Sequence, residues 1–176
     1  MRKFHVFAVV LSIMLGGLMW SPRPAEAAST SLLAQPVYVE VYANTYYWPV
    51  KAGLSVVDKH TGTYLVYGAC RAGYRCIRVS ERSGCLWLQE KWRCDWIGAT
   101  YLWSWGAQLY LNSSHRKDGY TKKVIATAHE GGHTAGLIAH TSTCSDVMQW
   151  RLPCWYGGPL PPVRFNSSQS AILATH

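Results

Sequence analysis

Two histidines and a glutamate lie within the five-residue stretch His129-Glu130-Gly131-Gly132-His133. Histidines four residues apart on an α-helix project from the same face, as two ligands of one tetrahedral metal ion must. The Glu130 carboxylate can reach a water on that metal without being a ligand itself. Two histidines and a glutamate are also poor material for a buried helix face. The spacing therefore predicts a zinc site in which Glu130 takes a proton from a water whose pKa the metal lowers to about 7.

A catalytic zinc ion requires a third protein ligand. No glutamate follows Glu130, and the later candidates are the histidines His140 and His176 and the aspartate Asp146. Gly136 can end the helix in a left-handed conformation and turn the chain back, which returns His140 to the metal within a few residues. We expect His140 to be the third ligand, and Asp146 is the alternative.

The stretch 129–140 resembles the active-site pattern of the metzincin proteases, HExxHxxGxxH or HExxHxxGxxD. In that clan a tight turn bearing a methionine, the Met-turn, lies beneath the metal. Residues 145–148 resemble this turn, with Met148 as its methionine. Within the clan, the run Cys-Ser-Asp-Val-Met at 144–148 is most similar to the snapalysins, small secreted bacterial neutral proteases.

The resemblance covers roughly residues 107–154 and implies a secreted zinc endopeptidase acting on protein or peptide substrates. It also implies that residues 107–112 form the edge strand that pairs with substrate. One position departs from the pattern, because the family's third ligand falls on Ala139 and His140 is one residue late. Either the loop bulges to admit His140 or the ligand is lost. The second case would describe a catalytically inactive binding protein on a metzincin-like scaffold.

The elements that must position these residues indicate one α+β domain. Hydrophobic periodicity and turn residues predict about four strands, an active-site helix and a loop-rich C-terminal part. The resemblance implies a small metzincin-like domain in which the strands form a twisted mixed sheet and the C-terminal part contains the Met-turn. The charged, tryptophan-rich segment 81–96 is expected to be a loop. The expected strands are 37–42, 63–67, 76–79 and 107–112, and the expected helices are 51–59, 121–137 and 169–174.

The N-terminus has the composition of a secretory signal peptide. A basic start is followed by an apolar run over residues 6–20 and by Ala25-Glu26-Ala27, a small-x-small cleavage pattern. The apolar run is shorter than the roughly 20 residues that span a bilayer. We therefore expect residues 1–27 to be a signal peptide and residues 28–176 to be a single secreted metalloprotease domain, extracellular and free of the membrane.

Six cysteines follow the predicted signal peptide, and an even number in an exported chain indicates three disulfides. Six cysteines allow fifteen pairings, which sequence alone does not separate. We expect Cys144 to pair with Cys154 around the Met-turn, and we expect the other pairs to be Cys70–Cys76 and Cys85–Cys94. A cysteine zinc site is disfavoured because the chain has no CxxC pair.

The chain carries a formal net charge of +8, but its basic residues are scattered and form no nucleic-acid-binding stripe. We expect a monomer with a protein or peptide substrate and no nucleic-acid partner. Tryptophans gather in one region and could bind sugars or bases, although a core role is the favoured interpretation. They are Trp87, Trp92, Trp96, Trp103 and Trp105.

Overall fold

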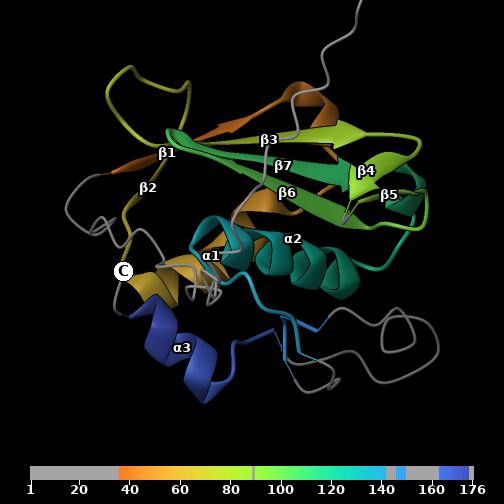
Figure 1. The fold of residues 1–176 in the computed structure, drawn as a ribbon. Helices are drawn as coiled ribbons and strands as arrows, with labels where there is room; N and C mark the ends of the chain where they lie inside the picture. Colours follow the sequence, from red (N-terminus) through yellow and green to blue (C-terminus); the bar gives the residue numbers. More distant parts are fainter. Residues whose placement is uncertain (1–35, 89, 142–145, 150–162, 175–176) are drawn as a thin grey trace, which may run out of the picture.

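A five-stranded, mostly parallel sheet covered on one face by two helices forms the body of the protein (Figure 1). This computed structural model describes residues 36–88, 90–141, 146–149 and 163–174, so the predicted signal peptide lies outside the described residues. No helix within those residues has the length and apolar character needed to cross a membrane.

The strands of the main sheet are arranged in the order β2-β1-β3-β7-β6. The first four are mutually parallel, and β6 pairs with β7 in the antiparallel sense as an edge strand. In chain order they are β1 (Val37–Val41), β2 (Leu65–Tyr67), β3 (Cys76–Arg82), β6 (Gly98–Trp103) and β7 (Gly106–Asn112). A separate antiparallel hairpin is formed by β4 (Leu86–Leu88) and β5 (Lys91–Arg93).

Three α-helices complete the described fold: α1 (Val50–Thr61), α2 (Tyr120–Thr134) and α3 (Ser167–Leu173). Short 3-10 turns at Ala43–Thr45 and Ser113–His115 precede α1 and α2. Helices α1 and α2 lie side by side under the sheet, and α3 packs against α1 (Figure 1). The central strands are apolar on the face turned toward these helices, which buries Val39, Val79 and Leu109 completely.

The predicted helices and strands are present, with shifted ends. The expected helix 121–137 is α2, which ends at Thr134, and the expected helix 51–59 is α1, which extends to Thr61. Gly62 ends α1 with φ 62°, in the left-handed region that glycine adopts readily. The predicted mixture of helices and strands is therefore confirmed at this level, although the main sheet has five strands rather than four.

The prediction of a loop over residues 81–96 was wrong. Strand β3 continues to Arg82, and the hairpin β4–β5 occupies half of the segment. Strand β6 then follows at Gly98–Trp103 and takes the edge position, so β7 lies inside the sheet between β3 and β6. The expectation that residues 107–112 form the edge was consequently wrong as well.

The tryptophan cluster is mainly a surface feature. Trp96 alone among the five is buried, and its indole N–H donates to the Gly84 carbonyl oxygen at 2.7 Å. The favoured core role fails for the others because they lie on the short hairpin and at the outer end of β6, where few elements cover them. Their exposed fractions are 53% for Trp87, 68% for Trp92, and 44% for both Trp103 and Trp105.

Two of the three expected disulfides are present, Cys70–Cys76 and Cys85–Cys94. The second closes the base of the β4–β5 hairpin, and the first ties the loop after β2 to the start of β3. Cys144 and Cys154 lie outside the described residues, so their pairing stays a prediction.

Candidate metal centre

Helix α2 carries the candidate site and packs tightly against α1 through glycines. A side-chain carbon built at Gly131 would lie 2.8 Å from methyl carbons of both Leu54 and Val57. The buried face of α2 is otherwise made of small and aliphatic residues, among them Ile125 and Ala128, which are both fully buried. Because one side of α2 packs against α1, the side that carries Glu130 and Gly132 lies toward β6 and the segment around Met148.

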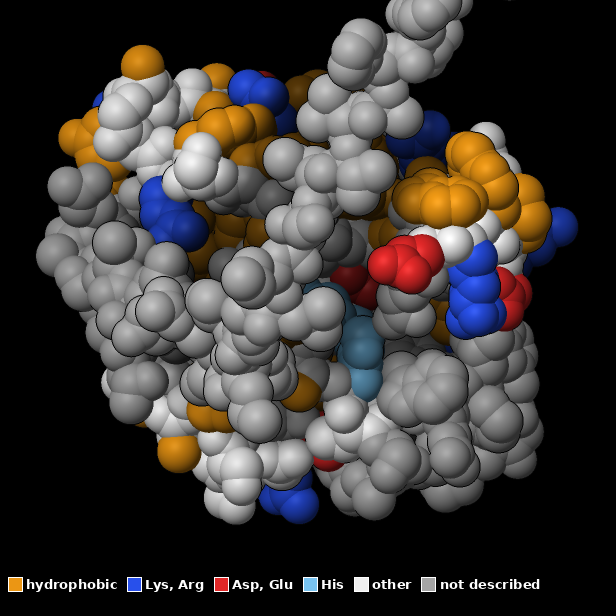
Figure 2. All heavy atoms as spheres, in the orientation of Figure 1, with side chains coloured by type: hydrophobic (Ala, Val, Ile, Leu, Met, Phe, Trp, Pro, Cys, Tyr) orange, Lys and Arg blue, Asp and Glu red, His pale blue; other side chains and the backbone are white. Residues whose placement is uncertain are grey.

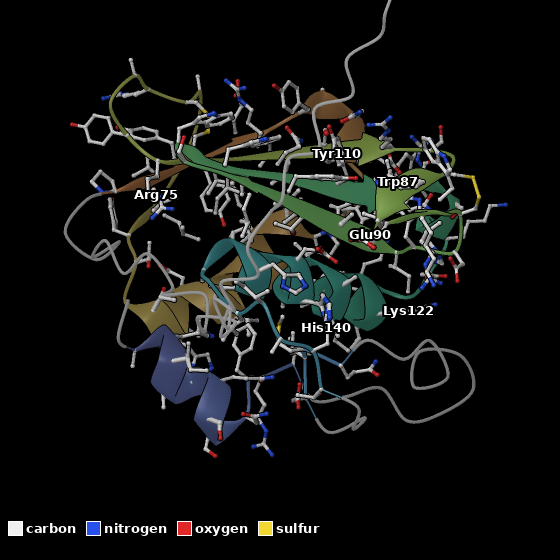
Figure 3. The ribbon with its side chains drawn as sticks, viewed as in Figure 1. Arg75, Trp87, Glu90, Tyr110, Lys122 and His140 are labelled. Atoms are coloured by element: carbon white, nitrogen blue, oxygen red, sulfur yellow. A yellow bond between two sulfur atoms is a disulfide. The ribbon has the colours of Figure 1, made fainter. Side chains whose placement is uncertain are left out.

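Three histidine side chains converge beside α2. The Nε2 atom of His140 lies 3.0 Å from Nε2 of His133 and 3.2 Å from Nε2 of His129. All three potential ligand atoms lie within 4.8 Å of one another. Figure 3 shows His140 just below α2, and in Figure 2 histidine side chains reach the surface near the centre of the face shown. These residues could hold a metal ion that is reachable from outside.

Hydrogen bonds to backbone carbonyls orient two of the imidazoles. Nδ1 of His129 lies 2.8 Å from the Val147 oxygen, and Nδ1 of His133 lies 2.6 Å from the Leu137 oxygen. A carbonyl oxygen only accepts, so each Nδ1 carries the proton and each Nε2 presents a lone pair. The lone pairs on Nε2 of His129 and His133 both face Nε2 of His140, and neither of the first two rings can donate a hydrogen bond to it. This arrangement suits a cation bound by all three nitrogens.

The surroundings keep the three imidazoles neutral. Burial, and after it the neighbouring His133, lower the pKa of His129 to about 3. Burial likewise lowers the pKa of His133 and of His140. Neutral imidazole is the form that binds a metal, so little deprotonation is needed for these side chains to act as ligands near neutral pH.

Glu130 lies beneath strand β6. Thr100 Oγ1 is 2.7 Å from Glu130 Oε2 and 3.0 Å from the Glu130 backbone oxygen. Gly98 makes the room, because a side-chain carbon there would lie 2.8 Å from Glu130 Oε1. Burial raises the pKa of the carboxyl to about 7, although the Thr100 hydrogen bond acts in the opposite direction. A carboxyl with that pKa can both accept and return a proton near neutrality.

A tight turn after α2 brings His140 to the other histidines. Gly136 has φ 95°, and the Leu137 amide donates back to the Gly132 oxygen at 3.0 Å. Further along, the Thr141 amide donates to the Met148 oxygen at 3.0 Å. The turn and this tether accommodate the extra residue at Ala139, so His140 lies in the cluster despite its late position in the sequence.

Met148 is fully buried beneath α2. A side-chain carbon built at Gly132 would lie 2.7 Å from Met148 Sδ and 3.0 Å from a ring carbon of Phe165. The glycine between the two helical histidines therefore lets the methionine approach the helix backbone at the level of the candidate metal ligands.

Asp146, the alternative ligand, is occupied elsewhere. It is 1% exposed, and its Oδ1 accepts from the Met148 amide at 2.8 Å and from the side chains of Thr141 and Gln169 at 3.1 Å. Its Oδ2 accepts from Asn166 Nδ2 at 3.1 Å. These bonds join the turn to the start of α3, and Asp146 is not part of the histidine cluster.

Another possible ligand group among the described residues is Glu40 with Cys70 and Cys76. The two cysteines form a disulfide, which removes their thiolates from metal chemistry. His176, the other late histidine of the sequence, lies outside the described residues.

Several contributors to the site were not evident from sequence. They are Gly98 and Thr100 of β6 and the carbonyl oxygens of Leu137 and Val147. Backbone carbonyls leave no residue-type signal, and β6 lay in a segment whose aromatic composition obscured the strand. No family model matches the chain, and no curated protein matches it significantly.

Proposed function

We propose that this protein is a zinc-dependent endopeptidase in which His129, His133 and His140 hold the metal and Glu130 is the general base. The observation that carries the proposal is the convergence of three Nε2 atoms within 4.8 Å on a helix that also bears a buried glutamate. Three protein ligands with a fourth position left open are typical of catalytic zinc sites.

The donor set favours zinc among the common divalent metals. All three donors are neutral imidazole nitrogens, whereas magnesium and calcium prefer oxygen ligands. When bound, zinc would supply a Lewis acid that acidifies water and polarises a peptide carbonyl. The carbonyl oxygens of Val147 and Leu137 keep the His129 and His133 rings oriented for this task.

In this proposal Glu130 accepts a proton from the attacking water and later delivers it to the leaving amine. Thr100 holds Oε2 of the carboxylate, which leaves Oε1 as the atom for proton transfer. The raised pKa of about 7 suits both steps near neutral pH. Burial under β6 also limits the exchange of that proton with bulk water.

An extended peptide is the substrate that the unpaired edge of β6 suits best. Strand β6 pairs with β7 along one edge, and no described strand pairs with its other edge. The unpaired N–H and C=O groups of an edge strand can receive a peptide as an added strand. Because Thr100 of β6 also holds Glu130, such a peptide would lie close to the general base.

The turn at Gly136 and the buried Met148 support placing the protein among the metzincins, close to the snapalysins. The two disulfides support an oxidising compartment, in line with a signal peptide over residues 1–27 and an extracellular, monomeric enzyme.

Zinc quantification combined with a casein digestion assay tests the proposal. We expect about one zinc per chain and hydrolysis that a chelator abolishes and added zinc restores. Glu130→Gln should retain the metal and lose hydrolysis, because it removes proton transfer alone. A protein that binds zinc but cuts no peptide would instead be an inactive binding protein, and a protein that binds no metal would refute the proposal.

A further inference from the structure

A cavity of about 200 Å³ lies between the sheet and the C-terminal ends of α1 and α2. Its walls are largely apolar. Apolar cavities of roughly 150 Å³ in other proteins bind benzene. One aromatic or large aliphatic side chain would therefore fit inside. The wall residues include Leu54, Val57, Leu65, Ile77 and Ala107.

The cavity adjoins the candidate metal centre. His133 and Gly136 line it from α2 and the following turn, and Leu102 and Trp103 line it from the end of β6. Leu102 is 49% exposed and Trp103 is 44% exposed, so the cavity reaches the surface at this end. The cavity is thus bordered by one candidate metal ligand, His133, and by the end of β6, two residues beyond Thr100.

The cavity wall also includes two charged residues, Asp58 of α1 and Arg75 just before β3. In Figure 3, Arg75 lies at the left of the molecule and His140 near its centre. These two wall residues carry charges of opposite sign, so the cavity has no strong preference for either sign. A neutral, apolar group is the occupant that these walls favour, since a lone charged group would be desolvated without a dedicated partner.

The direction of β6 indicates which part of a substrate reaches the cavity. Strand β6 passes Glu130 at Gly98 and Thr100 and reaches the cavity two residues later, about 7 Å further along. A peptide added in the antiparallel sense, the slightly more stable one, runs from the cavity toward Glu130. The residue at the cavity therefore precedes the bond that is cut.

We infer that this cavity is a subsite for a large, neutral apolar side chain on the N-terminal side of the scissile bond. The inference rests on the proposed peptidase function and adds a substrate preference to it. The side chain would lie among the apolar wall residues of the cavity, next to Trp103 and the turn at Gly136.

Peptides varied at each position around one cleavable bond test this subsite. We expect the zinc-loaded protein to cleave substrates with Phe or Leu at one position before the bond about tenfold faster in kcat/KM than substrates with Ala there. Thr63→Trp, which fills the cavity from its wall, should lower kcat/KM for the Phe substrate to the value for the Ala substrate. Tyr64→Trp, at a neighbouring residue that is 74% exposed, should keep the preference.

Toluene binding by the metal-free protein, followed by NMR, gives a readout independent of catalysis. We expect wild type and Tyr64→Trp to bind toluene and Thr63→Trp to lose that binding. Cleavage without a preference before the bond, or a preference unchanged in Thr63→Trp, would overturn the subsite while leaving the peptidase intact. If no peptide is cut by the zinc-loaded protein, the proposed function and the subsite both fail, and toluene binding would then assign the cavity to a different apolar ligand.

Discussion

Nδ1 of His129 lies 2.8 Å from the backbone oxygen of Val147, the residue immediately before the buried Met148. This hydrogen bond joins the metal-facing side of α2 to the turn beneath it. Asp146 stabilises this turn, because its carboxylate accepts a hydrogen bond from the Met148 backbone N–H. The orientation of one candidate ligand therefore depends on a buried aspartate that does not belong to the ligand set.

His140→Ala should lower zinc affinity by orders of magnitude and remove hydrolysis, because two helical histidines alone hold zinc weakly. His60→Ala is a suitable control, since His60 lies on α1 and outside the histidine cluster. Competition with a chromogenic chelator measures the affinity. Stoichiometric, tightly held zinc in His140→Ala would refute the ligand assignment.

Asp146→Asn should destabilise the fold by about 2–3 kcal/mol, because an amide cannot accept all the hydrogen bonds that the two carboxylate oxygens now receive. The loss should appear in chemical denaturation of both the metal-free and the zinc-loaded protein. Zinc stoichiometry should be retained at saturating metal. Loss of zinc binding from an otherwise stable Asp146→Asn variant would indicate that Asp146 is a ligand.

Gly98→Ala should reduce kcat while leaving the zinc content unchanged. The added carbon would lie 2.8 Å from Glu130 Oε1, so the carboxyl must move away from its position beside Thr100. A misplaced general base costs about 10²–10⁴-fold in rate. Gly119→Ala is the matched control, because a side-chain carbon at Gly119 meets no atom within 4 Å. Equal activity in both variants would show that the Glu130 position is not critical.

Glu130→Gln should stabilise the metal-free protein increasingly as the pH rises from 4.5 to about 7. Burial raises the carboxyl pKa from 4.5 to about 7, so folding favours the protonated form. That contribution is fully present below pH 4.5 and is lost as the pH passes the folded-state pKa, where the buried group must ionise. The variant avoids this loss, and its advantage should reach about 3 kcal/mol at pH 8.

Urea denaturation of wild type and Glu130→Gln, both kept metal-free by a chelator, measures this stability difference at pH 4.5 and pH 8. Zinc should offset the cost of the ionised Glu130, so the advantage of Glu130→Gln should shrink in the loaded protein. A stability difference that is independent of pH would show that Glu130 titrates at its usual value.

Local features of the candidate site were predictable from sequence because they depend on near neighbours in the chain. The four-residue spacing of His129 and His133 follows from the helical repeat, and the left-handed turn at Gly136 follows from the freedom of glycine. The disulfides Cys70–Cys76 and Cys85–Cys94 likewise close short loops.

The tertiary structure decided what depends on residues far apart in the chain. It placed His140 rather than Asp146 with the other histidines, since Asp146 is used by Thr141, Met148, Asn166 and Gln169. It also placed β6, and not β7, beside Glu130, because strand order is set by pairing between distant segments and not by the composition of either strand. The hydrogen bond from Thr100 and the room left by Gly98 exist only through that pairing.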